Sequence, residues 1–210
     1  MTAHLLCSGL PIDATAFVHS VLQFADRKSK MYDSAIAAAL RRSLSGQPKY
    51  QRAVYSRLLP LIQTCTGLQQ DWLLYVAALV AFYPQLPVEA KASQNFGSSC
   101  LALSKSRSKK ASHDNESEDQ SSREVTSTER RFLALLSLPG EALKTPLTAL
   151  IRQMKAAENS VPIYYPQLIY DLIAWDHPSQ YVQDHWARSF WRVDTEKTED
   201  SNQPLKQTEN

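Results

Sequence analysis

Residues 69–84 read QQDWLLYVAALVAFYP, and this stretch decides the fold class. From Trp72 to Tyr83 the side chains are apolar almost without interruption, so a helix formed here is hydrophobic on nearly all of its faces. Such a helix is buried on every side and lies at the centre of a bundle. The stretch is about 12 residues long, whereas a helix that spans a bilayer needs roughly 20. It therefore predicts a central bundle helix that ends before Pro84, not a membrane span.

Three amphipathic segments precede this central helix. Apolar side chains recur at helical spacing over residues 12–24, 34–44 and 51–63. Gly46 is expected to stop the second of these helices, and Pro60 to end or kink the third. The N-terminal part of the chain therefore predicts about four helices.

A second helical set follows in the C-terminal half. Apolar side chains again recur at helical spacing over residues 129–138, 145–154, 165–175 and 178–191. Neither half contains a run that alternates between apolar and polar residues in the manner of a strand. We therefore expect an all-α protein.

Two segments are too polar to join a core. Residues 104–127 read SKSRSKKASHDNESEDQSSREVTS, a low-complexity stretch whose few apolar side chains cannot offset the entropy cost of ordering. Residues 195–210 have the same character. We predict two small helical-bundle domains at residues 1–92 and 93–194, with a disordered insertion at 104–127 and a disordered C-terminal tail at 195–210.

Composition excludes several protein classes. The chain has 210 residues, of which 43% are hydrophobic, so it is not disordered throughout. Three cysteines cannot form a disulfide scaffold, and five glycines leave no Gly-rich phosphate loop. The N-terminus has no basic region followed by an apolar core, so no secretory signal is predicted. We expect a soluble, reduced, cytoplasmic protein with no membrane partner.

The side chains that could carry catalysis form no recognisable site. Cys65 and Cys100 lie among small or apolar residues and are expected to be buried thiols. His177 and His185 have neither metal-ligand spacing nor a third ligand, so no metal and no cofactor are predicted. Asp171 lies on an otherwise apolar helix and is expected to pair with an arginine. We therefore expect no catalytic residue.

An aromatic group near the C-terminus leaves its role open. Trp186, Phe190 and Trp191 follow one another at helical spacing. Such a group can form a stacking platform for single-stranded bases. At this spacing it is more often part of a core or of a contact surface between proteins.

The arginines are more informative than the candidate catalytic groups. Pairs occur at Arg41-Arg42 and Arg130-Arg131, and Arg152 and Lys155 lie three residues apart on one helix. Each cation can belong to a solvated helix face or to a structural ion pair. Several together can form a groove that follows a phosphate backbone, since guanidinium groups bind phosphate in a bidentate manner. The sequence does not decide whether they converge.

Seven short motifs, read in order, carry a family resemblance. They are AAALRR at 37–42, YVAALVAFYP at 75–84, NFGSSCLAL at 95–103, ERRFLALL at 129–136, LIR at 150–152, YDLIAW at 170–175 and WARSFW at 186–191. In this order and spacing they resemble the CasB family, the small subunit of the type I-E CRISPR Cascade surveillance complex. The resemblance covers about residues 15–192, apart from the insertion at 104–127.

The resemblance implies a function without catalysis. Such proteins are all-α subunits that occur as two copies in the Cascade ribonucleoprotein and contact its backbone and large subunits, in antiviral defence. A basic face of the small subunit helps to hold the target strand and the displaced strand of the R-loop, and so stabilises it. A separately recruited nuclease cuts the DNA. The implied partners are therefore the other Cascade subunits, a second copy of the chain, CRISPR RNA and target DNA.

The resemblance also nominates the residues that bind nucleic acid. They are Arg41, Arg42, Arg130, Arg131, Arg152 and Lys155. Ser98 departs from the family, because that position after the Gly turn often carries a basic residue. We hypothesise that four cations of the insertion supply the missing charge from a flexible arm: Lys105, Arg107, Lys109 and Lys110.

Two alternatives stay open. The first is a helical adaptor that binds only protein, and it is distinguished by the absence of salt-dependent DNA binding. The second is an enzyme, which would need a polar pocket that holds a strongly perturbed titratable group.

Overall fold

A computed structural model describes residues 10–85, 94–114 and 126–192, with side chains described as far as residue 106 in the second range. Within these residues the protein is helical and contains no strand, so the all-α prediction is confirmed. The helices are α1 (Ala14–Ala25), α2 (Ser34–Ser43), α3 (Pro48–Ile62), α4 (Gly67–Phe82), α5 (Phe96–Asp114), α6 (Ser127–Leu136), the 3₁₀ turn η1 (Gly140–Ala142), α7 (Lys144–Ala156), α8 (Tyr165–Ile173) and α9 (Tyr181–Trp191).

Helix α4 is the central helix, as its all-round apolar sequence predicts. It contacts helices of both halves: α1, α2, α3, α7 and α8. Its N-terminus is fixed because the backbone N–H of Thr66 donates to Gln69 Oε1 at 3.0 Å. Leu73, Ala78 and Leu79, which at 100° per residue are spread around the helix, are all buried. The helix therefore forms the axis of the fold.

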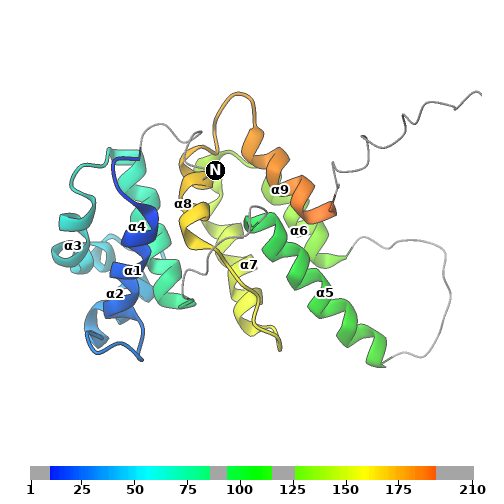
Figure 1. Cartoon of the computed structure of the whole chain (residues 1–210), viewed down its shortest axis with the longest axis horizontal. Helices are drawn as coiled ribbons and strands as arrows, with labels where there is room; N and C mark the ends of the chain where they lie inside the picture. Colours follow the sequence, from blue (N-terminus) through cyan, green and yellow to red (C-terminus); the bar gives the residue numbers. More distant parts are fainter. Residues whose placement is uncertain (1–9, 86–93, 115–125, 193–210) are drawn as a thin grey trace, which may run out of the picture.

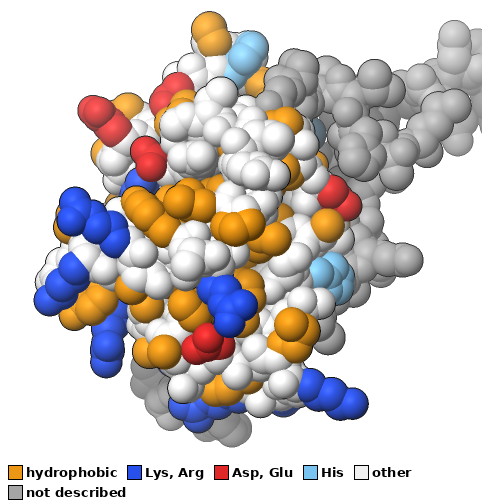
Figure 2. All heavy atoms as spheres, turned by 90° about the vertical axis from the view of Figure 1, so that its left-hand side faces the viewer, with side chains coloured by type: hydrophobic (Ala, Val, Ile, Leu, Met, Phe, Trp, Pro, Cys, Tyr) orange, Lys and Arg blue, Asp and Glu red, His pale blue; other side chains and the backbone are white. Residues whose placement is uncertain are grey.

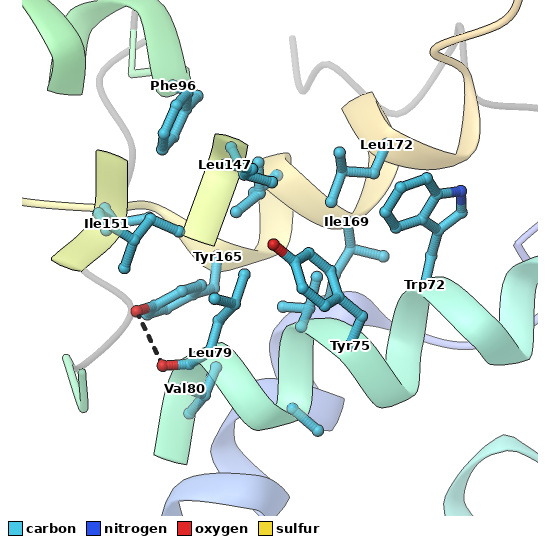
Figure 3. Packing of buried hydrophobic residues seen from close by; sticks show 14 of the residues in the cluster. Trp72, Tyr75, Leu79, Val80, Phe96, Leu147, Ile151, Tyr165, Ile169 and Leu172 are labelled. Atoms are coloured by element: carbon cyan, nitrogen blue, oxygen red, sulfur yellow. Dashed lines mark hydrogen bonds between the residues drawn. The ribbon is translucent and has the colours of Figure 1, made fainter. Parts of the chain in front are cut away.

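The two halves share one hydrophobic core across the junction between them. Helix α8 belongs to the C-terminal half of the chain, yet it packs against α1 and α4 of the N-terminal half (Figure 1). Side chains of α4, α7 and α8 meet there in one cluster (Figure 3). The division of the chain at residue 92 stays a prediction about sequence organisation, since the core itself is continuous.

Buried hydroxyl groups connect the halves by hydrogen bonds. The Tyr165 hydroxyl donates to the carbonyl of Tyr83 at 2.8 Å and approaches that of Leu79 at 3.4 Å (Figure 3). The Tyr75 hydroxyl donates to the Lys144 carbonyl at 2.8 Å and lies 2.9 Å from Thr148 Oγ1. Each bond satisfies a polar group inside the core that would otherwise be costly to bury.

One predicted helix boundary is wrong. Helix α5 continues to Asp114, so residues 104–114 are helical instead of belonging to a loop, while 115–125 lie outside the described residues. Helix α3 runs past Pro60 to Ile62, so Pro60 does not end this helix, and the alternative that it kinks the helix stays a prediction. Proline there removes one hydrogen bond, to Ser56, in the last turns of the helix, and water can solvate the freed carbonyl of this exposed residue. The predicted tail at 195–210 also lies outside the described residues.

The prediction that Asp171 pairs with an arginine is also wrong. Its carboxylate accepts a hydrogen bond from Trp186 Nε1 at 2.6 Å and another from Gln167 Nε2 at 2.8 Å. Burial raises the pKa of Asp171 to about 6, against the lowering effect of these two bonds and of the nearby His185. Asp171 therefore joins α8 to α9 through neutral donors.

The aromatic group of α9 lies in or against the core. Trp186 is fully buried, with its ring 5.0 Å from that of Phe96 and 4.9 Å from that of Trp175. Phe190 is buried and stacks on Phe132 at 4.5 Å. These rings are therefore packing residues and are not available as a stacking platform for bases.

Helices α5 and α9 approach each other most closely at Gly97. A methyl group on this residue would overlap the backbone carbonyl oxygen of Trp186 and lie 2.8 Å from its Cα. Beside this point, Asn95 Nδ2 donates to the His185 carbonyl at 3.2 Å and to Ser189 Oγ at 2.9 Å. Only glycine allows the two backbones to come this close.

Candidate nucleic-acid interface

Four of the six predicted cations converge at the junction of α2 with α7. Arg41 and Arg42 form the last turn of α2, a position that favours positive charge because the helix dipole is negative there. Arg41, Arg42 and Arg152 line a shallow pocket of about 290 Å³. Lys155 lies one turn beyond Arg152 on α7, close enough for the positive charge of Arg41 to lower its pKa.

Neutral polar groups complete this pocket, which we call the seam pocket. They are Ser45, Gln47 and Tyr50, together with the apolar Leu44. The Arg42 guanidinium carbon lies 5.9 Å from the centre of the Tyr50 ring, and Lys49 Nζ lies 4.9 Å from the same ring. Tyr50 therefore holds cations at the rim of the pocket by cation–π attraction.

Lys155 has a structural task as well as a place beside the seam pocket. Its Nζ donates to the carbonyl of Phe82 at 2.6 Å and lies 4.1 Å from the centre of the Phe82 ring. It thus caps the C-terminal end of α4, where backbone carbonyls lack partners. Partial burial, followed by the charge of Arg41, lowers its pKa. Two of its three N–H groups remain for another acceptor.

The charges of this site are not balanced by acids. Among the described residues, no carboxylate forms an ion pair with Arg41, Arg42, Arg152 or Lys155, whereas Arg57 of α3 pairs with Asp33 at 3.9 Å. These four positive charges repel one another. Their N–H groups also have no ion-paired carboxylate as acceptor among the described residues. Such a group attracts an anion, and phosphate matches the planar fork of arginine.

Arg130 and Arg131 do not join the seam pocket. Both are exposed on α6, which lies across the molecule from α2 (Figure 1). The preceding Glu129 is a packing residue, because its Oε1 accepts a hydrogen bond from Trp191 Nε1 at 3.0 Å. The six predicted cations therefore divide into the seam pocket and a separate position on α6.

A larger recess on α3 does not suit a phosphate. It has a volume of about 410 Å³ and is lined by Tyr55, Ser56, Leu59, Pro60 and Gln63, without a charged side chain. Figure 2 shows the face of the molecule on which α3 lies, with hydrophobic side chains across its middle, most Lys and Arg side chains toward its edges, and one basic side chain beside an acidic one below the middle. The smaller seam pocket is the better anion site because its lining carries the charge.

Sequence reasoning missed two roles. Tyr50 holds the cations of the seam pocket by cation–π attraction. In the sequence, the neighbouring Lys49 is the only indication of this role. Lys144 lies 5.4 Å from the ring of Trp72 and 5.9 Å from that of Tyr75, so it stabilises the contact between α7 and α4.

The structure also places the candidate metal-ligating and nucleophilic side chains of the described residues. No group of three metal-ligating side chains occurs there. Burial raises the pKa of the Cys65 and Cys100 thiols, which opposes a nucleophilic role, and their predicted burial is confirmed. Cys7 lies outside the described residues.

No helix among the described residues is both long enough and apolar enough to cross a membrane.

Comparisons with known proteins identify relatives. A family model described as CRISPR-associated protein Cse2 matches residues 37–191. CasB from M. ruber has the same fold at 22% identity, over 84% of this chain and 93% of that one, with a TM-score of 0.59. CasB from Thermus thermophilus is also 22% identical and gives a TM-score of 0.60, over 87% of this chain and 99% of that one. A chain of a CRISPR RNA-guided surveillance complex is 21% identical and gives a TM-score of 0.61, over 86% of this chain and 90% of that one. No curated protein matches this chain significantly.

Proposed function

Because the chain belongs to the Cse2 family of CRISPR-associated proteins, we propose that it is the non-catalytic small subunit of a type I-E Cascade surveillance complex. In this role it binds nucleic-acid backbone through its basic face and stabilises the R-loop between guide RNA and target DNA. It acts in the cytoplasm, beside the backbone and large subunits and a second copy of itself. The similar fold of a chain from a CRISPR RNA-guided surveillance complex supports the assembly.

The observation that carries the proposal is the seam pocket. Arg41, Arg42 and Arg152 come from helices more than 100 residues apart in sequence and converge, and no carboxylate of the described residues forms an ion pair with them. Like charges held close together repel one another, and an anion that binds between them relieves this repulsion. The phosphates of nucleic acid are anions that arginine binds well and that carry no sequence information.

The physics of R-loop formation suits such a contact. The RNA–DNA duplex is about as stable as the DNA duplex that it replaces, so strand exchange is nearly balanced. Contacts to the backbone of either DNA strand tip this balance without selecting a sequence. Base pairing with the guide RNA then reads the target sequence itself.

Co-purification tests the proposal. The tagged chain is expressed with the other genes of its own locus, and the proteins and nucleic acids that purify with it are identified. A large ribonucleoprotein that contains a short guide RNA is the expected result. A lone monomer that binds no DNA at low salt would overturn the proposal and favour the protein-only adaptor.

Replacing Arg152 or Arg41 by alanine is expected to weaken DNA binding equally for all sequences. If each contacts one phosphate, each replacement lowers the magnitude of the slope of log K against log salt by about 0.7 to 0.9. Fluorescence anisotropy on two unrelated DNA sequences at several salt concentrations measures this slope. Arg57→Ala is the matched control, because Arg57 is exposed but paired with Asp33. An equal loss in the control, or a loss limited to one sequence, contradicts the prediction.

The basic segment of α5 provides a separate test. Glutamine at Lys105, Arg107, Lys109 and Lys110 removes four positive charges and keeps good helix formers in a helix that continues to Asp114. If this segment contacts phosphates, the variant binds target DNA more weakly within the purified assembly and shows a smaller salt slope. Affinity and slope equal to those of wild type would exclude a role for the segment in DNA binding.

A further inference from the structure

The turn between α1 and α2 carries a surface that the proposed function does not use. Residues 27–31 read RKSKM, and Arg27, Lys28 and Lys30 are all exposed. Met31 is 68% exposed, which is the highest exposed fraction among the large hydrophobic side chains of the described residues. Three exposed cations and one exposed apolar side chain therefore lie within five consecutive residues. We call residues 27–31 the basic turn.

Hydrogen bonds hold the basic turn in one shape. The backbone N–H of Lys28 donates to Asp26 Oδ1 at 3.0 Å, and that of Ser29 donates to the Asp26 carbonyl at 3.0 Å. The N–H of Met31 donates to Ser29 Oγ at 3.2 Å. A surface that is already ordered loses little conformational entropy when a partner binds.

The acids beside the basic turn are occupied by the fold. Asp33 caps α2 by accepting from the backbone N–H groups of Ala35 at 3.0 Å and Ile36 at 3.1 Å, and its other oxygen lies 3.9 Å from Arg57. Asp26 accepts from Lys28 within the turn. Both carboxylates are thus turned to local partners, which leaves the outward charge of the turn positive.

The basic turn is separate from the seam pocket. It precedes the N-terminal end of α2, whereas Arg41 and Arg42 lie in the last turn of the same helix. At 1.5 Å per residue the two ends of α2 are about 12 to 15 Å apart. The turn lies at the lower end of the N-terminal half in Figure 1. Its role can therefore be tested without altering the phosphate site.

We propose that the basic turn docks an acidic protein surface that has a small apolar recess for Met31. The three cations supply charge complementarity, which speeds association and fixes orientation. Methionine is flexible and polarisable, so it fills an irregular recess well. A phosphate backbone would satisfy the cations but offers no recess for the methionine, unless that side chain wedges between bases.

Site-specific crosslinking tests the proposal and identifies the occupant. The photoreactive amino acid p-benzoylphenylalanine is placed at position 31, and at position 68 as a control, because Leu68 is 60% exposed and has no Lys or Arg within three residues in the sequence. Each variant is co-expressed with the proteins of its own locus. The expected product joins position 31 to a peptide of another protein that contains acidic and apolar residues. Crosslinks to nucleic acid, or none above those of position 68, would overturn the proposal.

Affinity measurements separate this surface from nucleic-acid binding. Met31→Ser is expected to weaken retention in the co-expressed assembly by roughly ten- to a hundredfold, the range for burial of one apolar side chain. The affinity of the isolated chain for DNA should not change, and Leu68→Ser should affect neither. Equal retention of Met31→Ser and wild type, or a loss of DNA affinity, overturns the docking surface. Failure of the wild-type chain to assemble would instead reject the proposed function and, with it, docking to these proteins.

Discussion

Replacing Gly97 by alanine is expected to lower the free energy of unfolding by about 3 kcal/mol or more. The added methyl group would overlap the backbone carbonyl of Trp186, and a backbone atom cannot rotate away as the end of a side chain can. Helix α5 would have to move from α9, which also separates the rings of Phe96 and Trp186. Urea unfolding followed by circular dichroism measures the loss.

Gly67→Ala is the matched control for this substitution. Gly67 begins α4, and a methyl group there meets no atom within 4 Å. Alanine also restricts the unfolded chain more than glycine does, so this variant should be as stable as wild type or slightly more stable. If both variants lose the same stability, the close approach of α5 to α9 is not the cause.

Replacing Asp171 by asparagine is expected to change how stability depends on pH. The pKa of this buried carboxyl is raised from 3.8 to about 6, so the folded chain holds the proton more tightly than the unfolded chain does. Its contribution is therefore fully present below pH 3.8 and is lost as pH rises toward 6. The loss amounts to about 3 kcal/mol, because each pH unit in this interval changes the free energy by about 1.4 kcal/mol. Asparagine does not titrate, so it avoids this loss.

The measurement is the difference in unfolding free energy between Asp171→Asn and wild type at several pH values. This difference should move in favour of the variant between pH 4 and 6 and stay constant above. Trp186→Phe removes a hydrogen bond that lowers the pKa of Asp171, so the same interval should extend to higher pH. A difference that is constant from pH 4 to 7 would contradict the raised pKa.

The sequence predicts the helices well where one pattern dominates. Helix α4 is apolar on all sides, and this alone places it at the centre. The end of α5 is different, because its C-terminal part has no apolar period and its low-complexity composition indicates a loop. Local helix propensity and the packing of its first turns extend this helix to Asp114.

The candidate site is predictable only in part, for a geometric reason. Arg41, Arg42 and Arg152 can be identified as candidates from the sequence. The distance between helices α2 and α7, which brings them together, cannot be derived from it. Arg130 has the same local character and lies elsewhere. The prediction that Asp171 pairs with an arginine is wrong for a similar reason. A buried carboxylate needs hydrogen-bond donors, and an indole or an amide serves as well as an arginine.

The position of α8 in the shared core has a consequence for synthesis on the ribosome. The surface of α1 and α4 against which α8 packs is made by residues that are translated early, whereas α8 ends only at Ile173. At about 5 to 20 residues per second, the nascent chain exposes this apolar surface for several seconds or longer. Chains terminated before α8 would keep it exposed permanently. Such fragments are expected to bind chaperones or aggregate, and nonsense mutations before residue 165 should yield insoluble protein.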